Sequence, residues 1–235
     1  MQNRVIYNND GSNMTFRSYV SKVFVYVALG LLVSGVFSFI IGTNVQVLSF
    51  MLSFGIVGVF LPLILEIVIA IYFSKRLMTM SKQTAYICYF LYSALTGISF
   101  SYIFMVYSGA DIMFAFASTT VLFVCMSILG RNTSLDLTKA SNYLFYGLLG
   151  IIISTLLNML LFKSSTFDLI ISYAAVIIFL VLIAYDMQKL RDLYNHGMSD
   201  GELYEKLLIF GSFQLYLDFI NLFIRILQIF SRRRD

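Results

Sequence analysis

Five polar side chains recur along one face of the last apolar segment of the chain, which contains the stretch LYLDFINLFIRILQIF. They are spaced by four, three, four and three residues, which places them on one side of an α-helix; they are Gln214, Asp218, Asn221, Arg225 and Gln228. A charged side chain at the centre of a membrane helix costs roughly 2.5 to 3.5 kcal/mol on insertion scales. We therefore expect the stripe to face a bundle interior or a water-filled cavity, either as a polar path or as packing in which Asp218 and Arg225 satisfy one another.

Three more ionisable residues are candidates for the same site. Asp186 follows the apolar stretch VLIAY, Glu66 lies inside the stretch LILEIVIAIYF, and Arg76 ends that segment. Two carboxyl groups brought together in a poorly hydrated site do not both ionise, so one proton tends to be shared between them. Such a pair is a pH sensor and a weak cation site. The alternative for Asp186 is a helix-end carboxylate in water beside Lys189.

Composition indicates which class of protein must position these groups. Of 235 residues, 60% are hydrophobic and 12% are charged, against about 25% charged in ordinary soluble domains, and the mean hydropathy is +0.87. These values are typical of an integral membrane protein surrounded by a lipid bilayer. The net charge of +4 is spread over short loops. This distribution indicates how the chain is oriented in the membrane and argues against a nucleic-acid partner.

The apolar runs predict an all-α fold with seven transmembrane helices. Runs long enough to cross a bilayer cover approximately residues 23–42, 50–73, 84–107, 112–129, 143–162, 167–185 and 207–230. They lack the two-residue alternation of a membrane β-barrel. The domain organisation that follows is a cytoplasmic N-terminal segment at 1–22, a transmembrane domain at 23–230 and a basic tail at 231–235.

The positions of Lys and Arg predict a cytoplasmic N-terminus. Basic residues fall in the N-terminal segment and in the second, fourth and sixth connections, whereas the first and third connections have none. Seven crossings then place Arg232, Arg233 and Arg234 outside, against the positive-inside rule. We favour seven because the last run is long enough to cross.

The motif AYDMQKL, followed by LYLDFINLFIRILQIF and a short basic tail, resembles the signature of the Bax inhibitor-1 family, especially its bacterial YccA-type members. This resemblance implies a seven-helix bundle whose last helix is central. It also implies a pH-sensitive calcium leak in which Asp186 and Asp218 form a latch with a shared proton, and in which Arg76 competes for the latch and Glu66 belongs to the gate. Calcium prefers six to eight oxygen ligands, so two carboxylates predict weak binding of a permeant ion, with no resident cofactor.

The latch requires a specific arrangement of the last two helices. Asp186 and Asp218 are 32 residues apart, and a symmetrical hairpin turning near Gly197 leaves Asp218 several residues deeper in the membrane. The two carboxyls can meet only if the sixth helix continues past Tyr185 or if residues 201–206 form an extra turn before the seventh.

Two other functions compete with the leak. The pair of aspartates is similar to an intramembrane aspartyl protease, but the glycine-flanked motif of that family is absent around Asp218, so we expect no enzyme. The bacterial relatives also suggest a non-catalytic regulator that binds a membrane-anchored AAA protease through residues 1–22. The same resemblance favours the bacterial cytoplasmic membrane as the location.

Overall fold

A computed structural model describes residues 15–133, 135–197 and 200–231 of the protein. Residues 1–14 of the predicted N-terminal segment and residues 232–235 of the basic tail lie outside the described part. Within that part the chain is almost entirely helical. The helices are α1 at Phe16–Thr43, α2 at Val45–Ser53, α3 at Ile56–Arg76, α4 at Lys82–Phe100, α5 at Ile103–Val106, α6 at Gly109–Asn132, α7 at Ser141–Leu157, α8 at Ser165–Gly197 and α9 at Gly201–Ser231. A 3₁₀ turn, Leu137–Ala140, precedes α7, and a π-helical turn, Asn158–Phe162, follows it.

Among the described residues, seven helical segments are long and apolar enough to cross a membrane, which confirms the predicted fold class. Capping side chains fix where several of them begin, because the first amides of a helix have no partner inside it. The hydroxyls of Thr15, Ser81 and Ser108 accept hydrogen bonds from backbone amides in the first turns of α1, α4 and α6. The first spanning helix thus begins at Phe16, inside the segment expected to precede the membrane.

Two of the predicted runs are interrupted. The run at 50–73 breaks at Gly55, whose φ of +59° is a conformation that favours glycine, so α2 ends at Ser53 and α3 begins at Ile56. The run at 84–107 contains a turn after Phe100, and the short helix α5 continues the crossing to Val106. Apolar composition alone does not reveal such breaks, because both sides of each break are equally hydrophobic.

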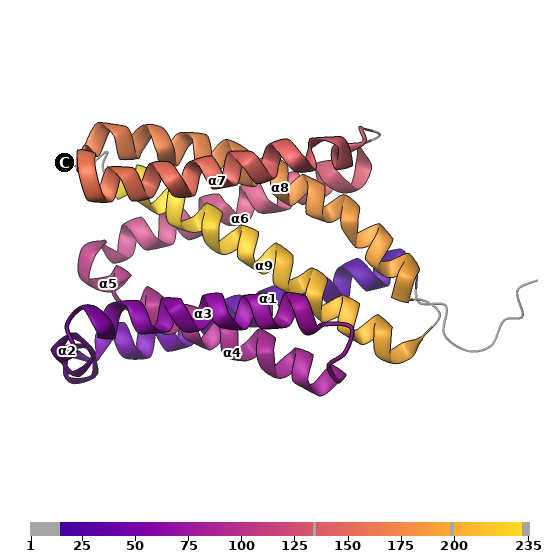
Figure 1. The fold of residues 1–235 in the computed structure, drawn as a ribbon, viewed down its shortest axis with the longest axis horizontal. Coiled ribbons are helices and arrows are strands. Elements are labelled where there is room, and N and C mark those ends of the chain that lie inside the picture. The colour runs from indigo at the N-terminus through magenta and orange to yellow at the C-terminus, as the bar shows by residue number, and fades with distance from the viewer. Residues whose placement is uncertain (1–14, 134, 198–199, 232–235) are drawn as a thin grey trace, which may run out of the picture.

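The last helix is the centre of the bundle, as predicted. In its most apolar window 72% of α9 is buried, whereas the other six spanning segments reach between 17% and 44%. It packs against α8, α6, α1 and α4, while α3 packs on α4 and α7 packs on α8 (Figure 1). One face of α9 therefore lies between α3 and α7 with few close backbone contacts to either. The half-buried residues of this face are Gln214, Asn221, Arg225 and Gln228 of the polar stripe together with Phe210, Leu217 and Ile224, whereas Asp218 is buried.

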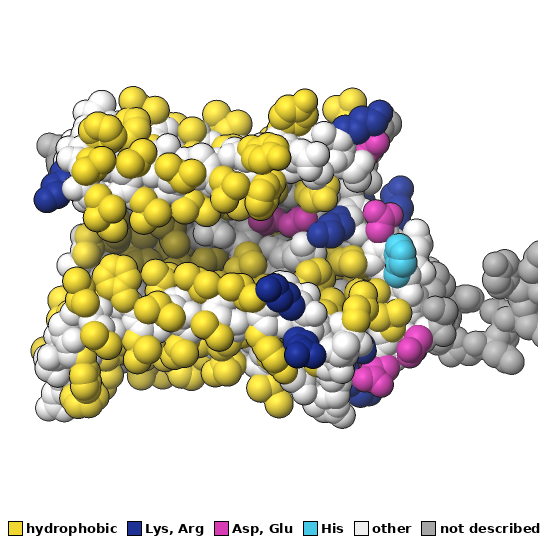
Figure 2. Space-filling model, in the orientation of Figure 1, with side chains coloured by type: hydrophobic (Ala, Val, Ile, Leu, Met, Phe, Trp, Pro, Cys, Tyr) yellow, Lys and Arg dark blue, Asp and Glu magenta, His cyan; other side chains and the backbone are white. Residues whose placement is uncertain are grey.

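The two ends of the bundle differ in charge. The connections α3 to α4 and α8 to α9 lie at one end, and α2, α5 and the C-terminal end of α9 lie at the other (Figure 1). Figure 2 shows that the charged side chains of this face gather mostly at the first end, and that acidic side chains also lie in the hollow between its two apolar halves. The hollow lies where α9 crosses between the two groups of helices.

Candidate functional site

Asp186 of α8 and Asp218 of α9 meet inside the bundle. Both side chains are buried, at 9% and 7% exposed, and the two carboxyls are hydrogen-bonded to each other. A carboxylate is only an acceptor, so this bond requires a proton held between the two groups. The second oxygen of Asp218, Oδ2, is fully buried and has no hydrogen-bond partner among the described residues.

The lengths of α8 and α9 explain why these residues meet. α8 continues twelve residues past the predicted end at 185 and stops at Gly197, and α9 begins at Gly201. Both of the alternatives that the spacing allowed are thus present, and together they bring the two aspartates side by side on the adjacent helices α8 and α9. Gly197 packs against the backbone of Tyr204, which closes the hairpin tightly.

The charge that faces this pair comes from α8. Lys189 lies one turn beyond Asp186, is half-buried, and its ammonium acts on both carboxyls. Arg76, which the resemblance implied as the competing cation, is exposed at the end of α3. Lys189 was considered above only as a solvent partner for Asp186, although its spacing of three residues already placed it on the same face of the helix.

A cavity of about 430 Å³ lies beside the pair, at the charged end of the bundle. Its lining includes Tyr185 and Lys189, which flank Asp186, together with Asp192 and His196 from the last turns of α8. Nδ1 of His196 is 2.7 Å from the backbone oxygen of Asp192. The cavity therefore forms a vestibule with ionisable side chains on the α8 side, next to the residues that flank Asp186.

Glu66 lies in a different place. Its carboxylate is 7% exposed and accepts hydrogen bonds from Thr96 Oγ1 at 3.2 Å and from Ser99 Oγ at 2.5 Å, both on α4. The hydroxyl of Tyr92 of α4 also faces this carboxylate. The sequence predicts that the aspartates and Glu66 belong to one gate, but the structure places them in two separate centres. The aspartates form one centre between α8 and α9, and Glu66 forms another between α3 and α4.

The polar stripe joins α9 to its neighbours at its far end. Arg225 donates to Gln228 Oε1 at 3.2 Å and to Thr155 Oγ1 of α7 at 3.3 Å, and Ser172 of α8 donates to the same Gln228 oxygen at 3.1 Å. Asn221 donates to the backbone oxygen of Leu217 in its own helix at 2.8 Å. Arg225 and Asp218 therefore have other partners, and the stripe is held by contacts with α7 and α8 instead of by an internal ion pair.

Sequence reasoning did not find one further buried cation, Lys206. Its ammonium donates to the backbone oxygens of Met78 and Met80, at 3.3 Å each, in the turn that follows α3. Lys206 is only 9% exposed, and it fastens the start of the central helix to the α3 to α4 connection. In the sequence, Lys206 lies within the first two turns of α9, where a lysine is usually exposed to solvent.

Metal chemistry has little support in the described residues, where no three side chains of the His, Cys, Asp or Glu types come together. The aspartate pair offers at most four carboxylate oxygens, fewer than the six to eight that calcium prefers. The two aspartates alone therefore do not complete a calcium coordination shell.

Comparison with known proteins gives one consistent result. The family model described as "Inhibitor of apoptosis-promoting Bax1" matches residues 16–235. The chain is 39% identical to an uncharacterized protein of Rickettsia prowazekii, over 95% of this chain and 94% of the relative. It is 34% identical to the inner membrane protein YbhL of Escherichia coli, over 93% of both chains. The chain belongs to the Bax inhibitor family of integral membrane proteins.

Proposed function

We propose that the protein is a pH-sensitive calcium leak whose gate is the contact between Asp186 and Asp218. The observation that carries this proposal is a hydrogen bond between two buried carboxyls that join a peripheral helix to the central one. A purely structural contact at this position is more simply made by apolar side chains, because a buried carboxyl pair is costly to desolvate.

The shared proton sets the gate. With one proton between them, the carboxyls bind each other and hold α8 against α9. When that proton leaves, two negative charges are in contact in a poorly hydrated site, and their repulsion favours separation of the helices. Lys189, at the rim of the vestibule, faces both carboxyls and offsets part of this repulsion.

The chemistry of the permeant ion follows from the same groups. Carboxylate oxygens are suitable ligands for a hard divalent cation, and only two carboxyls are present, so a calcium ion is held weakly and released. The half-buried polar stripe, which includes Gln214 and Asn221, supplies further oxygen atoms along α9. We place this activity in a bacterial cytoplasmic membrane, since the relatives are bacterial and YbhL is named an inner membrane protein.

Calcium flux into dye-loaded proteoliposomes over about pH 5 to 8 tests this proposal. We expect flux above that of empty liposomes, with a clear dependence on pH. In Asp218→Asn the amide donates to Asp186 without a titrating proton, so flux should stay near the wild-type minimum at every pH. In Asp218→Ala the bond is lost, and flux should be raised and independent of pH.

A buried aspartate from another helix provides the matched control. Asp111 is 8% exposed and is bonded to Ser108 at the start of α6, so Asp111→Asn should keep the wild-type pH profile. Absence of flux at every pH in correctly folded protein would reject the leak and favour the regulator. Cleavage of a membrane-spanning substrate that is lost in Asp218→Asn would instead establish a protease.

A further inference from the structure

A second buried carboxyl lies on the opposite side of α9 from the aspartate pair. Glu66, near the middle of α3, is surrounded by hydroxyl groups of α4, and those of Thr96 and Ser99 donate to its two oxygens. Tyr92 completes the set. Each donor is neutral, so these bonds satisfy the carboxyl without supplying a compensating charge.

The hydroxyl groups continue away from Glu66 as a connected chain. The Thr96 hydroxyl faces that of Tyr216 of α9, and Tyr216 Oη lies 2.6 Å from Ser34 Oγ of α1. Ser34 and Tyr216 are 4% and 0% exposed, respectively. The order Ser34, Tyr216, Thr96, Glu66 thus crosses from α1 through α9 and α4 to α3, and every linking group can both donate and accept a hydrogen bond.

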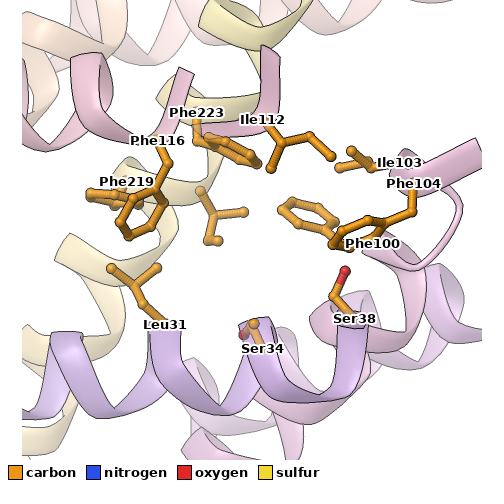
Figure 3. Close-up of a pocket in the computed structure, with 12 residues that line it drawn as sticks. Leu31, Ser34, Ser38, Phe100, Ile103, Phe104, Ile112, Phe116, Phe219 and Phe223 are labelled. Carbon is orange, nitrogen blue, oxygen red and sulfur yellow. The ribbon is translucent and has the colours of Figure 1, made fainter. Parts of the chain in front are cut away.

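One end of this chain opens into a cavity. Ser34 and Ser38 lie along one edge of a space of about 120 Å³, and aromatic side chains including Phe100, Phe116 and Phe223 surround the rest of it (Figure 3). The cavity lies towards α5, at the end of the bundle opposite the vestibule of the aspartate pair (Figure 1). The two carboxyl centres are therefore approached from opposite ends of the molecule.

The apolar lining decides which cation can use this route. A hydrated metal ion would lose its water against phenylalanine rings and meet only two serine hydroxyls, which is strongly unfavourable. A proton needs only hydroxyls, or one or two waters that Ser34 and Ser38 can bind. The titratable side chains that face Glu66 are Tyr92 of α4 and Tyr216 of α9.

We propose that Glu66 is a proton-binding site separate from the aspartate pair, and that the hydroxyls of Ser34, Tyr216 and Thr96 relay protons to it. In the relay, a proton binds the Ser34 oxygen while the original Ser34 proton passes to Tyr216. Tyr216 passes its proton to Thr96, and Thr96 passes its proton to Oε2 of Glu66. The carboxylate becomes a carboxylic acid, and each hydroxyl regains one proton.

Infrared difference spectra of reconstituted protein, between alkaline and acidic buffer, test the binding site. Protonation of a carboxylate produces the C=O stretch of a carboxylic acid. We expect Glu66→Gln to remove one such band that remains in Asp186→Asn and in Asp218→Asn. A set of carboxylic acid bands unchanged by Glu66→Gln would overturn the proposal. This measurement needs no calcium flux, so the proposed leak and the proton site can fail separately.

The relay is tested by the rate at which the Glu66 band shifts after transfer into D₂O. We expect Tyr216→Phe to slow the shift on the order of tenfold, the effect of about one hydrogen bond on a rate. Tyr89→Phe is the matched control, because Tyr89 is a buried tyrosine of the same cluster whose hydroxyl donates to the Tyr26 backbone oxygen outside the chain. Ser34→Ala interrupts the relay at a second position if Tyr216→Phe does not fold. Rates equal to that of the Tyr89→Phe control would overturn the relay.

Discussion

Lys206 illustrates how this protein uses a single buried charge to join two elements. Its ammonium is the hydrogen-bond donor for the backbone oxygens of Met78 and Met80, which follow the end of α3. We predict that Lys206→Met lowers the free energy of unfolding by about 1 to 3 kcal/mol, because the methionine fills the space but leaves the two carbonyls, of which that of Met80 is buried, without this donor. Thermal unfolding in detergent measures this change.

Lys82 supplies the control at the residue scale. It begins α4 in the same part of the molecule, but its side chain is exposed. Lys82→Met should leave the midpoint of unfolding unchanged. Equal loss of stability in both variants would show that general charge at this end of the bundle, and not the two hydrogen bonds, is responsible.

Single residues also show how far sequence can predict the site. Asp186 and Asp218 were identified from a motif of charged residues in apolar surroundings, a signal that is strong because such residues are costly there. Glu66 was identified in the same way, but its partners were not. Threonine and tyrosine are common in membrane helices, so Thr96 and Tyr216 carry no distinctive signal in the sequence. Their chain of hydroxyls is identified only from the packing of α1, α4 and α9.

At the scale of helices, two glycines allow neighbouring backbones to approach closely. A Cβ atom on Gly97 of α4 would lie 2.5 Å from the backbone oxygen of Ser34, and one on Gly130 of α6 would lie 2.3 Å from that of Ala184. Small residues at helix contacts are a common device of membrane bundles. We predict that Gly97→Ala and Gly130→Ala each destabilise the fold by about 1 to 3 kcal/mol, measured as the fraction folded after heating.

Gly150 of α7 is the matched position, because a Cβ there meets nothing within 4 Å. Gly150→Ala should keep or slightly raise stability, since alanine favours a helix over glycine.

The ends of the helices were harder to predict from the sequence than the helices themselves. Apolar runs predicted all seven crossings, but helix ends depend on caps and on packing, and the true end of α8 at Gly197 lies in a polar stretch that periodic hydrophobicity did not cover.

At the scale of the whole molecule, seven crossings place the two ends of the described chain on opposite sides of the membrane. The basic residues gather at the end that holds the α3 to α4 and α8 to α9 connections, which predicts that this end is cytoplasmic (Figure 2). The C-terminal end of α9 is then outside. This orientation runs against the positive-inside rule, and we predict that burial of α9 among the other helices outweighs its flanking charge.

Two exposed glutamines at opposite ends test this orientation. Gln83 lies in the first turn of α4 and Gln46 in the first turn of α2. In a background with Cys88 and Cys125 replaced by alanine, a membrane-impermeant maleimide added to intact cells should label Gln46→Cys and not Gln83→Cys. Permeabilised cells should give labelling of both. The reverse pattern in intact cells would invert the protein, and the vestibule of the aspartate pair would then sense the pH outside the cell instead of the pH of the cytoplasm.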